Sequence, residues 1–585
     1  SDDWGNLTQI TTDHGQGYTR QVNNVFNVDP SKWFVGQLLS SSETATSPTY
    51  VPITRTTEYG YDPDTGLVSS ETIEPNNNPL RVERTFVRDD FGNVTETVVT
   101  GPSFNTRSSF TVYDTRGQFP IESRNSIGHS EFRTFDVRHG KVLTHTGPNG
   151  LVTEYQYDAF GTKIHELLPD GTERRWLRYR ADDPYHPANA VYYVRVDGSQ
   201  QTPELVFFNV LGAEVRRETR SFNSLPIYRD QIYNNLGQLW KRSRLYHPGN
   251  TVYWESFNYD LLGRVLTHTE AHSAVTNFNY SGLSRTSVND ANQSNTIVSN
   301  VLGKTISVSD ALGNTMVQEY DGFGNLTLVR DPDQNETHIR YDIRGHRIAI
   351  DDPDLGLRQF EYDALGNVVR ETDAKGQIVI NHYDQLGRMI RRDEPEGITA
   401  WQFDIGPLAI GRMSKVSNGE NFIESYSYDS FGRLSNTTNY LQGRKYTFRQ
   451  SYDEYGRIRT LTYPSGFTLR YDYSSLGFLE TVADLASGHI YFSAQQYNQE
   501  GFLSKYRFGN GLETEKHFNP ARGSLERIRS GYIGNWSIQD HEYEYDSLLN
   551  LTKRIDHIQG REESFGYDHL SRLTSSQVVG GYGVS

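Results

Sequence analysis

The sequence contains no cysteine and only 3 methionines among its 585 residues. The absence of cysteine excludes disulfide bonds, thiol nucleophiles and cysteine-ligated zinc, and it fits a chain that passes through oxidising surroundings. No stretch approaches the roughly 18 consecutive apolar residues that a membrane-spanning helix needs. Basic residues form no long run and the net charge is −16, so nucleic acid is not expected as a partner.

A helical period is also missing, because no long stretch repeats its apolar residues every ~3.6 positions. Apolar residues make up only 35% of the chain, and the mean hydropathy is −0.67. A solid globule of this length should have a richer interior, whereas a sheet with solvent on at least one face needs less apolar material. The 38 tyrosines, 28 phenylalanines and 51 glycines are typical of strands joined by tight turns. The composition therefore predicts an all-β protein.

An internal repeat is the strongest signal in the sequence. Tyr320, Tyr341, Tyr362 and Tyr383 follow one another at intervals of 21 residues, and each begins a Tyr-Asp-x-x-Gly motif. The residues of the predicted structural signature are Tyr157, Asp158, Gly161, Tyr259, Asp260, Gly263, Tyr320, Asp321, Gly324, Tyr341, Asp342, Gly345, Tyr362, Asp363, Gly366, Tyr383, Asp384, Gly387, Tyr428, Asp429, Gly432, Tyr452, Asp453 and Gly456. Further copies begin at Tyr113, Phe208, Tyr233, Tyr473, Tyr497 and Tyr545, with degenerate ones at Tyr280, Ser299 and Phe403.

A second turn lies about half a period after each motif, as at Asp331-Pro332-Asp333 and Asp352-Pro353-Asp354. Asp side chains can accept hydrogen bonds from the backbone two residues on, Pro presets φ, and Gly accepts positive φ. Aromatic pairs two residues apart, such as Phe360 and Tyr362, share one face of a strand. Each repeat is therefore predicted to be one β-hairpin, with the Tyr at the end of a strand.

The number of hairpins predicts the architecture. At ~22 residues per hairpin the chain holds ~26 hairpins, and ~50 strands spaced ~4.8 Å apart would give a sheet ~240 Å wide. A flat sheet of that width would twist and expose its edges. We therefore expect tandem hairpins coiled into a hollow spiral shell, with a filled solenoid as the alternative.

No linker divides the chain, so we expect a single continuous repeat shell over residues 1–585. Three stretches depart from the period and are expected to be irregular insertions, near residues 25–57, 173–251 and 509–541. Both ends of the sequence lie in or near repeat turns. The sequence is thus expected to be a piece of a longer polypeptide, without the flanking N-terminal and C-terminal toxin regions.

The repeated Tyr-Asp-x-x-Gly-[Arg/Asn] motif at a 21-residue interval resembles the YD-repeat, or RHS, family over nearly the whole chain. Asn27 to Gly36 and Pro203 to Gly212 narrow the resemblance to SpvB-like B components of Tc toxins, with teneurins more distant. The resemblance implies a hollow cocoon around a C-terminal toxin domain, which a self-cleaving segment releases. No residue of this chain is assigned to that segment. It further implies a secreted bacterial protein whose partners are the enclosed toxin domain, on the same or a partner chain, and a delivery component.

For several acidic and histidine residues, a structural role in a turn or strand explains the sequence better than a catalytic or metal-binding role. Asp351-Asp352-Pro353-Asp354 occupies the second-turn position, where turn chemistry explains it. Asp331-x-Asp333-x-Asn335 begins like a calcium loop, but Glu336 stands where such loops have glycine. His268 and His272 have the spacing of a helical metal pair, yet on a strand they would be ~13 Å apart. We therefore expect no catalytic residues, no cofactor and no metal.

Three functional hypotheses follow. The first is a non-catalytic shell that encloses a toxin domain until delivery. The second is an extracellular adhesion or carbohydrate-binding scaffold, with a glycan as the partner, although aromatic stripes on strands are more often packing surfaces. The third is an enzyme acting on polysaccharide, which no constellation of residues supports.

Overall fold

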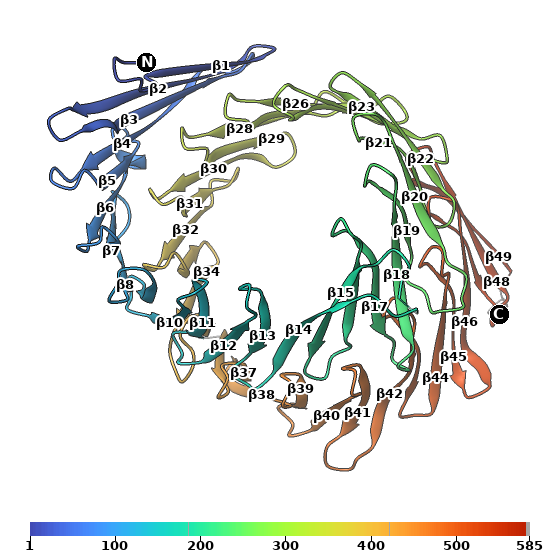
Figure 1. Ribbon diagram of the computed structural model, residues 1–585. Coiled ribbons are helices and arrows are strands. Elements are labelled where there is room, and N and C mark those ends of the chain that lie inside the picture. Colours follow the sequence, from blue (N-terminus) through green and yellow to red (C-terminus); the bar gives the residue numbers. More distant parts are fainter. Residues whose placement is uncertain (185, 420–421, 581–585) are drawn as a thin grey trace. The chain divides into compact units, whose positions relative to one another are not determined.

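The computed structural model describes residues 1–184, 186–419 and 422–580. Over these residues it contains 49 β-strands and a short 3-10 helix, η1 (Asn78–Leu80). The prediction of an all-β protein with helix limited to short pieces is confirmed. Figure 1 shows the strands following one another as hairpins in chain order.

Strands before residue 300 are β1 (Gln9–Gly15), β2 (Tyr18–Asp29), β3 (Phe34–Thr46), β4 (Ile53–Tyr61), β5 (Val68–Ile73), β6 (Val82–Arg88), β7 (Val94–Thr100), β8 (Arg107–Tyr113), β9 (Pro120–Arg124), β10 (Ser130–Asp136), β11 (Lys141–Thr146), β12 (Val152–Tyr157), β13 (Lys163–Leu167), β14 (Glu173–Arg180), β15 (Tyr192–Gly198), β16 (Glu204–Phe208), β17 (Glu214–Arg220), β18 (Pro226–Tyr233), β19 (Leu239–Ser243), β20 (Trp254–Tyr259), β21 (Val265–Thr269), β22 (Val275–Ser281), β23 (Ser284–Val288) and β24 (Ser294–Ser299).

Strands after residue 300 are β25 (Thr305–Ser309), β26 (Thr315–Tyr320), β27 (Leu326–Arg330), β28 (Glu336–Tyr341), β29 (Arg347–Asp352), β30 (Gly356–Tyr362), β31 (Val368–Thr372), β32 (Ile378–Tyr383), β33 (Met389–Glu394), β34 (Gly397–Phe403), β35 (Met413–Asn418), β36 (Phe422–Tyr428), β37 (Leu434–Leu441), β38 (Arg444–Tyr452), β39 (Ile458–Thr462), β40 (Thr468–Tyr473), β41 (Leu479–Asp484), β42 (Ile490–Tyr497), β43 (Leu503–Phe508), β44 (Leu512–Phe518), β45 (Leu525–Tyr532), β46 (Asn535–Tyr545), β47 (Leu551–Asp556), β48 (Arg561–Tyr567) and β49 (Leu573–Gly580).

The strands fall into two compact units. Unit 1 comprises Ser1–Val152, Ile297–Ser309 and Asn314–Tyr446, and unit 2 comprises Thr153–Thr296, Asp310–Gly313 and Thr447–Ser585. Within each unit, neighbouring strands of the chain pair antiparallel, as β30 does with β31 and β31 with β32. The single continuous shell over residues 1–585 stays a prediction.

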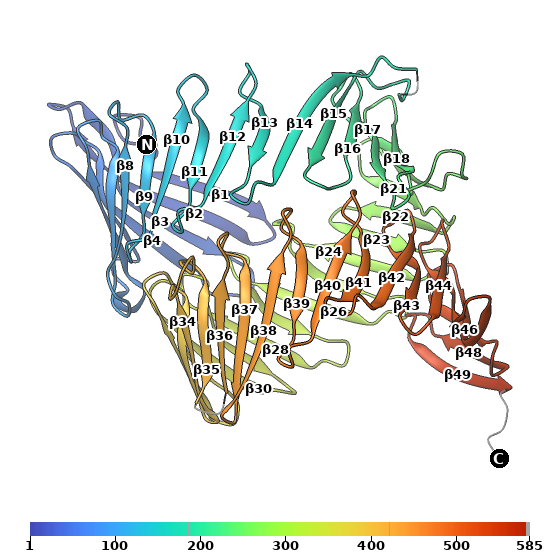
Figure 2. The ribbon, with the colours of Figure 1, turned by 90° about the horizontal axis from the view of Figure 1, so that it is seen from below.

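Each unit contains two runs of hairpins. In unit 1 the first run is β1–β11 and the second is β25–β37; in unit 2 the first run is β12–β23 and the second is β39–β49. Because the strands alternate in direction, successive turns lie at opposite edges of a run. Figure 2 shows β8–β11 of unit 1 edge to edge with β34–β37 of the same unit.

The three stretches predicted as irregular insertions contain β-strands. Residue 185, in the second stretch, lies outside the described residues. In the first stretch, β2 and β3 are 12 and 13 residues long and form an extended hairpin. In the second, Phe207, Ala190 and Val215 form a buried hydrophobic cluster with Tyr193 and Tyr233 packed against it. The sequence period is lost in these two stretches because the hairpins are longer or more apolar.

Little of the chain is fully buried. Its accessible area is 32712 Å², compared with about 21,000 Å² for a compact protein of this mass by the usual scaling. The excess means that much of both sheet faces is accessible in each unit. This explains the low apolar content, since a thin sheet has little interior to fill.

Candidate functional site

The Tyr-Asp-x-x-Gly motif builds a recurring tight turn at one edge of each run. In the copy at Tyr362, the Gly366 N–H donates to the Asp363 carbonyl at 3.0 Å, and the Asp363 N–H donates to the Asn367 carbonyl at 2.9 Å. Gly366 has φ +87°, and the strand register shifts between Glu361 and Tyr362. This is a β-turn closed by a bulge with glycine in the left-handed region. A residue with a Cβ would be strained there.

The signature residues occupy equivalent places in every predicted copy. The signature tyrosines are the last residues of β12, β20, β26, β28, β30, β32, β36 and β38. The signature glycines all have positive φ. The copy at Phe208 and the degenerate copies at Ser299 and Phe403 also lie at strand ends, and the degenerate copy at Tyr280 lies one residue before the end of β22. These residues are therefore placed to form the turns and not to converge on one reaction centre.

The aspartate that follows the tyrosine holds the turn through both carboxylate oxygens. Asp429 Oδ1 accepts from the N–H groups of Phe431 and Arg433 at 2.9 and 2.8 Å, and Oδ2 accepts from Arg433 Nε at 2.8 Å. Burial alone would raise the pKa of Asp429, but the hydrogen bonds from Arg433 outweigh it and hold the pKa below its ordinary value. The ionised aspartate is thus the form that fits the turn.

A pairing rule links the first turn residue to the fifth. In ten turns whose first residue is Asp, the fifth supplies a side-chain donor: Asp89–Asn93, Asp260–Arg264, Asp321–Asn325, Asp342–His346, Asp363–Asn367, Asp384–Arg388, Asp429–Arg433, Asp453–Arg457, Asp546–Asn550 and Asp568–Arg572. Where the first is Asn, as at Asn234 and Asn289, its Nδ2 donates to the acceptor Oε1 of Gln238 or Gln293 at 2.8 or 2.9 Å. The fifth residue is therefore chosen by hydrogen-bond polarity.

Two exceptions to this pairing leave an orphaned donor. Asn300 is followed at the fifth position by Lys304, and Asn498 by Phe502, neither of which offers a side-chain acceptor. The Nδ2 atoms of Asn300 and Asn498 are buried without a hydrogen-bond partner among the described residues. The orphaned amides show what is lost when the fifth residue does not match the first.

Many motif tyrosines tie adjacent strands together through their hydroxyl groups. The hydroxyls of Tyr362, Tyr383 and Tyr428 donate at 2.8, 2.9 and 2.6 Å to the carbonyls of Arg347, Val368 and Met413. Each acceptor is the first residue of the neighbouring strand. The ring therefore lies along the sheet edge and satisfies a carbonyl at the strand start, where the bulge has interrupted the pairing.

In unit 1 the turns of the second run contact the opposite turns of the first run, and we call this line of contacts the seam. Arg55 Nε donates to the Ile343 carbonyl at 2.6 Å, and the Arg55 guanidinium lies 3.7 Å from the ring centre of Phe323. Asn149 exchanges two hydrogen bonds with the backbone of Ile410, at 2.9 and 3.0 Å. These residues are more than 250 positions apart, so no local motif links them.

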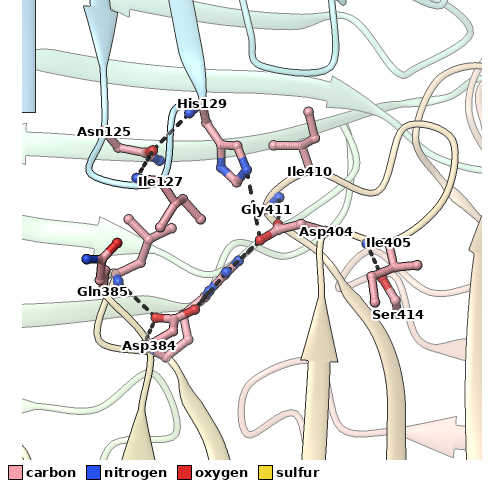
Figure 3. Close-up of polar contacts among 12 residues, drawn as sticks. Asn125, Ile127, His129, Asp384, Gln385, Asp404, Ile405, Ile410, Gly411 and Ser414 are labelled. Atoms are coloured by element: carbon pink, nitrogen blue, oxygen red, sulfur yellow. Dashed lines mark hydrogen bonds and ion pairs between the residues drawn. The ribbon is translucent and has the colours of Figure 1, made fainter. Parts of the chain in front are cut away.

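A charged cluster lies at the unit 1 seam (Figure 3). Arg388 donates from Nε to Asp384 Oδ2 at 2.8 Å and from its two terminal nitrogens to Asp404 at 3.0 and 2.6 Å. The Gly411 N–H donates to Asp404 Oδ1 at 2.6 Å, and His129 Nε2 lies 3.9 Å from Asp404 Oδ2. Hydrogen bonding from Arg388 lowers the pKa of Asp404. The cluster joins two turns of the second run to a turn of the first.

Unit 2 has a seam of the same kind between its own runs. Arg244 pairs with Glu500 at 3.0 Å, and His272 Nε2 lies 3.0 Å from the Ser547 carbonyl oxygen. Phe222 packs against Phe478 and Tyr497, with ring centres 5.8 and 5.3 Å apart. Both units therefore lock one run of turns against another with a mixture of ion pairs and apolar contacts.

Acid should weaken these turns and seams. The pKa values of Asp260, Asp404 and Asp568 are lowered, chiefly by hydrogen bonds from Arg264, Arg388 and Arg572. A carboxylate whose pKa is lower when folded contributes stability above its unfolded pKa near ~3.9, and that stability is lost as the pH falls. We expect a constant melting temperature from pH 7 to pH 5 and a steep fall below about pH 4, measured by scanning fluorimetry. A fall that begins between pH 7 and pH 5 would instead indicate histidine.

The acidic residues that resemble catalytic or metal sites also hold turns. Asp352 Oδ1 accepts from the N–H groups of Asp354 and Leu355, and both oxygens of Asp331 accept from Asn335. His268 stacks on Phe257 in β20, whereas His272 contacts the seam. Among the described residues, no three His, Cys, Asp or Glu side chains are grouped so that they could hold a metal ion.

Removal of divalent metal should therefore leave the protein unchanged. Because the turn carboxylates bond to backbone amides and guanidinium groups, no ligand set within residues 1–184, 186–419 and 422–580 is placed to contribute metal-binding energy to folding. We expect equal melting temperatures with and without about 5–10 mM EDTA, a concentration that removes bound divalent cations. A decrease of several degrees that added Ca²⁺ reverses would contradict this expectation.

The sequence indicates the pairing within each turn but not the contacts of the seam. The pairing between first and fifth turn residues was readable, because the repeats themselves align Asp with Asn or Arg and Asn with Gln. The seam residues Arg55, His129, Asn149, Phe222 and Arg244 carry no motif. They could be found only once the two runs of each unit had been placed together.

Comparison with known proteins agrees with this geometry. Residues 201–403 match the Teneurin YD-shell family model, and residues 135–173 match the RHS Repeat model. No curated protein matches the sequence. In the described part of the chain, no helix is both long and apolar enough to cross a membrane.

The fold is similar to that of solved Tc toxin structures. TcdB2–TccC3–Cdc42 aligns over 97% of this chain and 40% of that chain, with 13% identity and a TM-score of 0.78. TcdB2–TccC3 aligns over 97% of this chain and 38% of that chain, with 13% identity and a TM-score of 0.77. A Photorhabdus luminescens Tc holotoxin pore aligns over 97% of this chain and 40% of that chain, with 12% identity and a TM-score of 0.75. The present chain thus spans about two fifths of the length of these proteins.

Antiparallel hairpins with the same bulged turn and the same edge tyrosine define this chain as a β-hairpin repeat protein. Residues 201–403 of this sheet are similar to the teneurin YD-shell family, and residues 135–173 are similar to the RHS repeat. The expected resemblance to this family is confirmed.

Proposed function

We propose that this chain is a non-catalytic wall of a secreted bacterial toxin, which encloses a toxin polypeptide until delivery. The observation that carries the proposal is the seam in each unit. Turns of the second run close against turns of the first through contacts such as Asn149–Ile410 and Arg244–Glu500. A sheet joined edge to edge in this way can form a barrier to large molecules, whereas isolated hairpins cannot.

The similarity to the TcdB2–TccC3 and Tc holotoxin structures supports a toxin-associated role. The enclosed partner would be a toxin domain of the same polypeptide or of a second chain, and a delivery component would open the wall. The accessible faces on both sides of the thin sheet leave room for such a guest. Holding the guest behind a wall separates it from the producing cell without inhibiting its chemistry.

The hollow shell has a direct test in solution. A compact protein of 585 residues should have a radius of gyration near ~25 Å. We expect small-angle X-ray scattering to give a clearly larger value, with a pair-distance distribution weighted to long separations. A value at the compact expectation, or the profile of a rod, would contradict the hollow shell and favour a filled or linear solenoid.

Enclosure itself is tested by protease protection of the complete gene product. Polypeptide held behind the wall should resist digestion in the wild-type protein and become sensitive when the seam is weakened by Arg388→Met. An inactive protease added under the same conditions controls for spontaneous breakdown. Equal digestion of the guest in both proteins would overturn the proposal.

The match to the Teneurin YD-shell model supports a second candidate, an extracellular adhesion or carbohydrate-binding scaffold. This scaffold would bind its partner on an outer surface and hold nothing inside. Binding of an intact cell surface or a glycan by the folded chain, without any protected guest, would favour the scaffold over the toxin wall.

A further inference from the structure

Unit 2 has two edges that its own seam leaves uncovered. The seam uses the Tyr-Asp-x-x-Gly turns of the second run and the opposite turns of the first run. The Tyr-Asp-x-x-Gly turns of the first run therefore remain at a free edge, which we call the leading rim. The opposite turns of the second run form the other free edge, which we call the trailing rim. The two free rims thus carry the same two turn types that meet in the seam.

The exposed fraction of the third residue of each turn shows whether a second row of turns packs against it. On the leading rim this residue is Phe160, Leu211, Leu236 or Leu262, and the side chains are 90%, 78%, 81% and 78% exposed. At the seam the same position holds Tyr455, Leu476, Leu548 and Leu570, which are only partly exposed. The same apolar position is therefore shielded wherever a second row of turns is present.

The leading rim is prepared for contact with an apolar surface. In the turn of Leu236, Asn234 Oδ1 accepts from the Leu236 N–H, and Asn234 Nδ2 donates to Gln238. The polar groups of the turn are satisfied internally, so covering the tip desolvates mainly apolar surface and leaves few unpaired groups. Leu261 and Leu262, two strands along, extend the apolar row.

The trailing rim presents apolar side chains of its own. Leu485, Phe508, Tyr532 and Ile533 lie in or beside the turns of the second run, and all are well exposed. Phe222, which belongs to the same type of turn in the first run, packs against Phe478 and Tyr497 of the seam. An aromatic or aliphatic side chain at this edge is thus already used to grip a row of Tyr-Asp-x-x-Gly turns.

We propose that the leading rim of unit 2 binds the trailing rim of unit 2 in a second copy of this chain, which repeats the seam between molecules. The contact is head to tail, since the two rims differ, and it leaves one free rim on each end of the pair. Hydrophobic burial at the turn tips drives the contact, and the hairpin turns on both sides fix its register. The proposal goes beyond the toxin wall and holds whether or not the wall contains a guest.

The test uses complementary variants of the whole chain. The leading-rim variant is Leu236→Asp with Leu262→Asp, and the trailing-rim variant is Ile533→Asp. Wild type should associate with increasing concentration in sedimentation velocity, and each variant alone should weaken association at least tenfold. An equimolar mixture should give a 1:1 complex that does not grow, because each variant retains the rim that the other lacks. Phe132→Ser, an exposed side chain on a strand face of unit 1, should associate like wild type.

Three results would overturn the proposal. They are a wild-type chain that stays monomeric at all concentrations, variants that associate like wild type, and a mixture that forms no 1:1 complex. Circular dichroism and melting temperature show whether each variant is folded. If a variant is unfolded, hydrogen exchange on the wild type replaces it. Turns 234–237 and 532–535 should then become protected as concentration rises, and equal exchange at low and high concentration would contradict the contact.

Discussion

Replacing Arg388 by methionine should destabilise unit 1 by about 2–3 kcal/mol, because removing one partner from a partly buried charge network leaves the others unpaired. Arg388 bonds to both Asp384 and Asp404, so its loss leaves two carboxylates without their cation. Methionine keeps most of the apolar contact with the ring of Phe403, which the guanidinium covers at 4.4 Å. Urea unfolding should show the loss as a lower midpoint. Hydrogen exchange should speed up at Gly411, whose N–H donates to Asp404.

Arg433→Met provides the matched control. Arg433 bonds to Asp429 through the same atom and in the same turn position as Arg388 to Asp384, so the control removes an equivalent turn bond and leaves the Arg388–Asp404 pair intact. We expect a loss of about 1.5 kcal/mol, at the lower end of the range for a hydrogen bond to a charged group. Adding Asp404→Asn to Arg388→Met should restore part of the stability by removing one of the unpaired charges. Equal destabilisation by the two arginine variants would contradict the bridging role of Arg388.

Asp429→Asn should cost about 1.5–3 kcal/mol, as expected for a lost hydrogen bond to a charged group. Asparagine can keep Oδ1 toward the Phe431 and Arg433 amides, but its Nδ2 then faces Arg433 Nε, so two donors oppose each other. The double variant Asp429→Asn with Arg433→Gln recreates the Asn234–Gln238 pair, in which Nδ2 donates to Oε1 at 2.8 Å. We expect the double variant to recover most of the lost stability in urea unfolding.

Two single variants complete this cycle. Arg433→Gln alone should be mild, since glutamine can turn its amide and donate to Asp429. Asn234→Asp should also be mild, because Gln238 can turn in the same way. The coupling energy between positions 429 and 433 should reach about 1–2 kcal/mol, within the range for residues in direct contact. Additive effects of the two substitutions would show that hydrogen-bond polarity does not govern the pairing.

The difference between the two experiments separates local from tertiary stability. The Asp429–Arg433 pair acts within one turn and should change the stability of its own hairpin. The Arg388 cluster joins turns of both runs in unit 1 and should therefore change the seam, on which the proposed wall depends. If the seam stays intact in Arg388→Met, neutral contacts such as Asn149–Ile410 must supply most of its stability.

The sequence alone determined the local structure of this protein. Tyr362, Asp363 and Gly366 specify the end of a strand, a side-chain-capped turn and a left-handed residue, and each requirement involves atoms within a few residues. Repetition of that motif predicted the hairpins, the all-β fold and the family resemblance. Asp352 and Asp331 could be assigned to turns for the same reason, although their sequences suggest acid or calcium chemistry.

Only the tertiary structure decided which turns meet. His129 and Asp404, or Arg244 and Glu500, lie more than 250 residues apart and belong to no common motif. Their contact depends on the accumulated position of many hairpins, and small twists per strand add up beyond what a local pattern specifies. The same holds for exposure: Leu262 and Leu476 occupy the same turn position, but only the second has a row of turns against it. The hydrogen bonds of each turn are set by residues close in sequence. Whether a second row of turns packs against that turn depends on the assembled sheet.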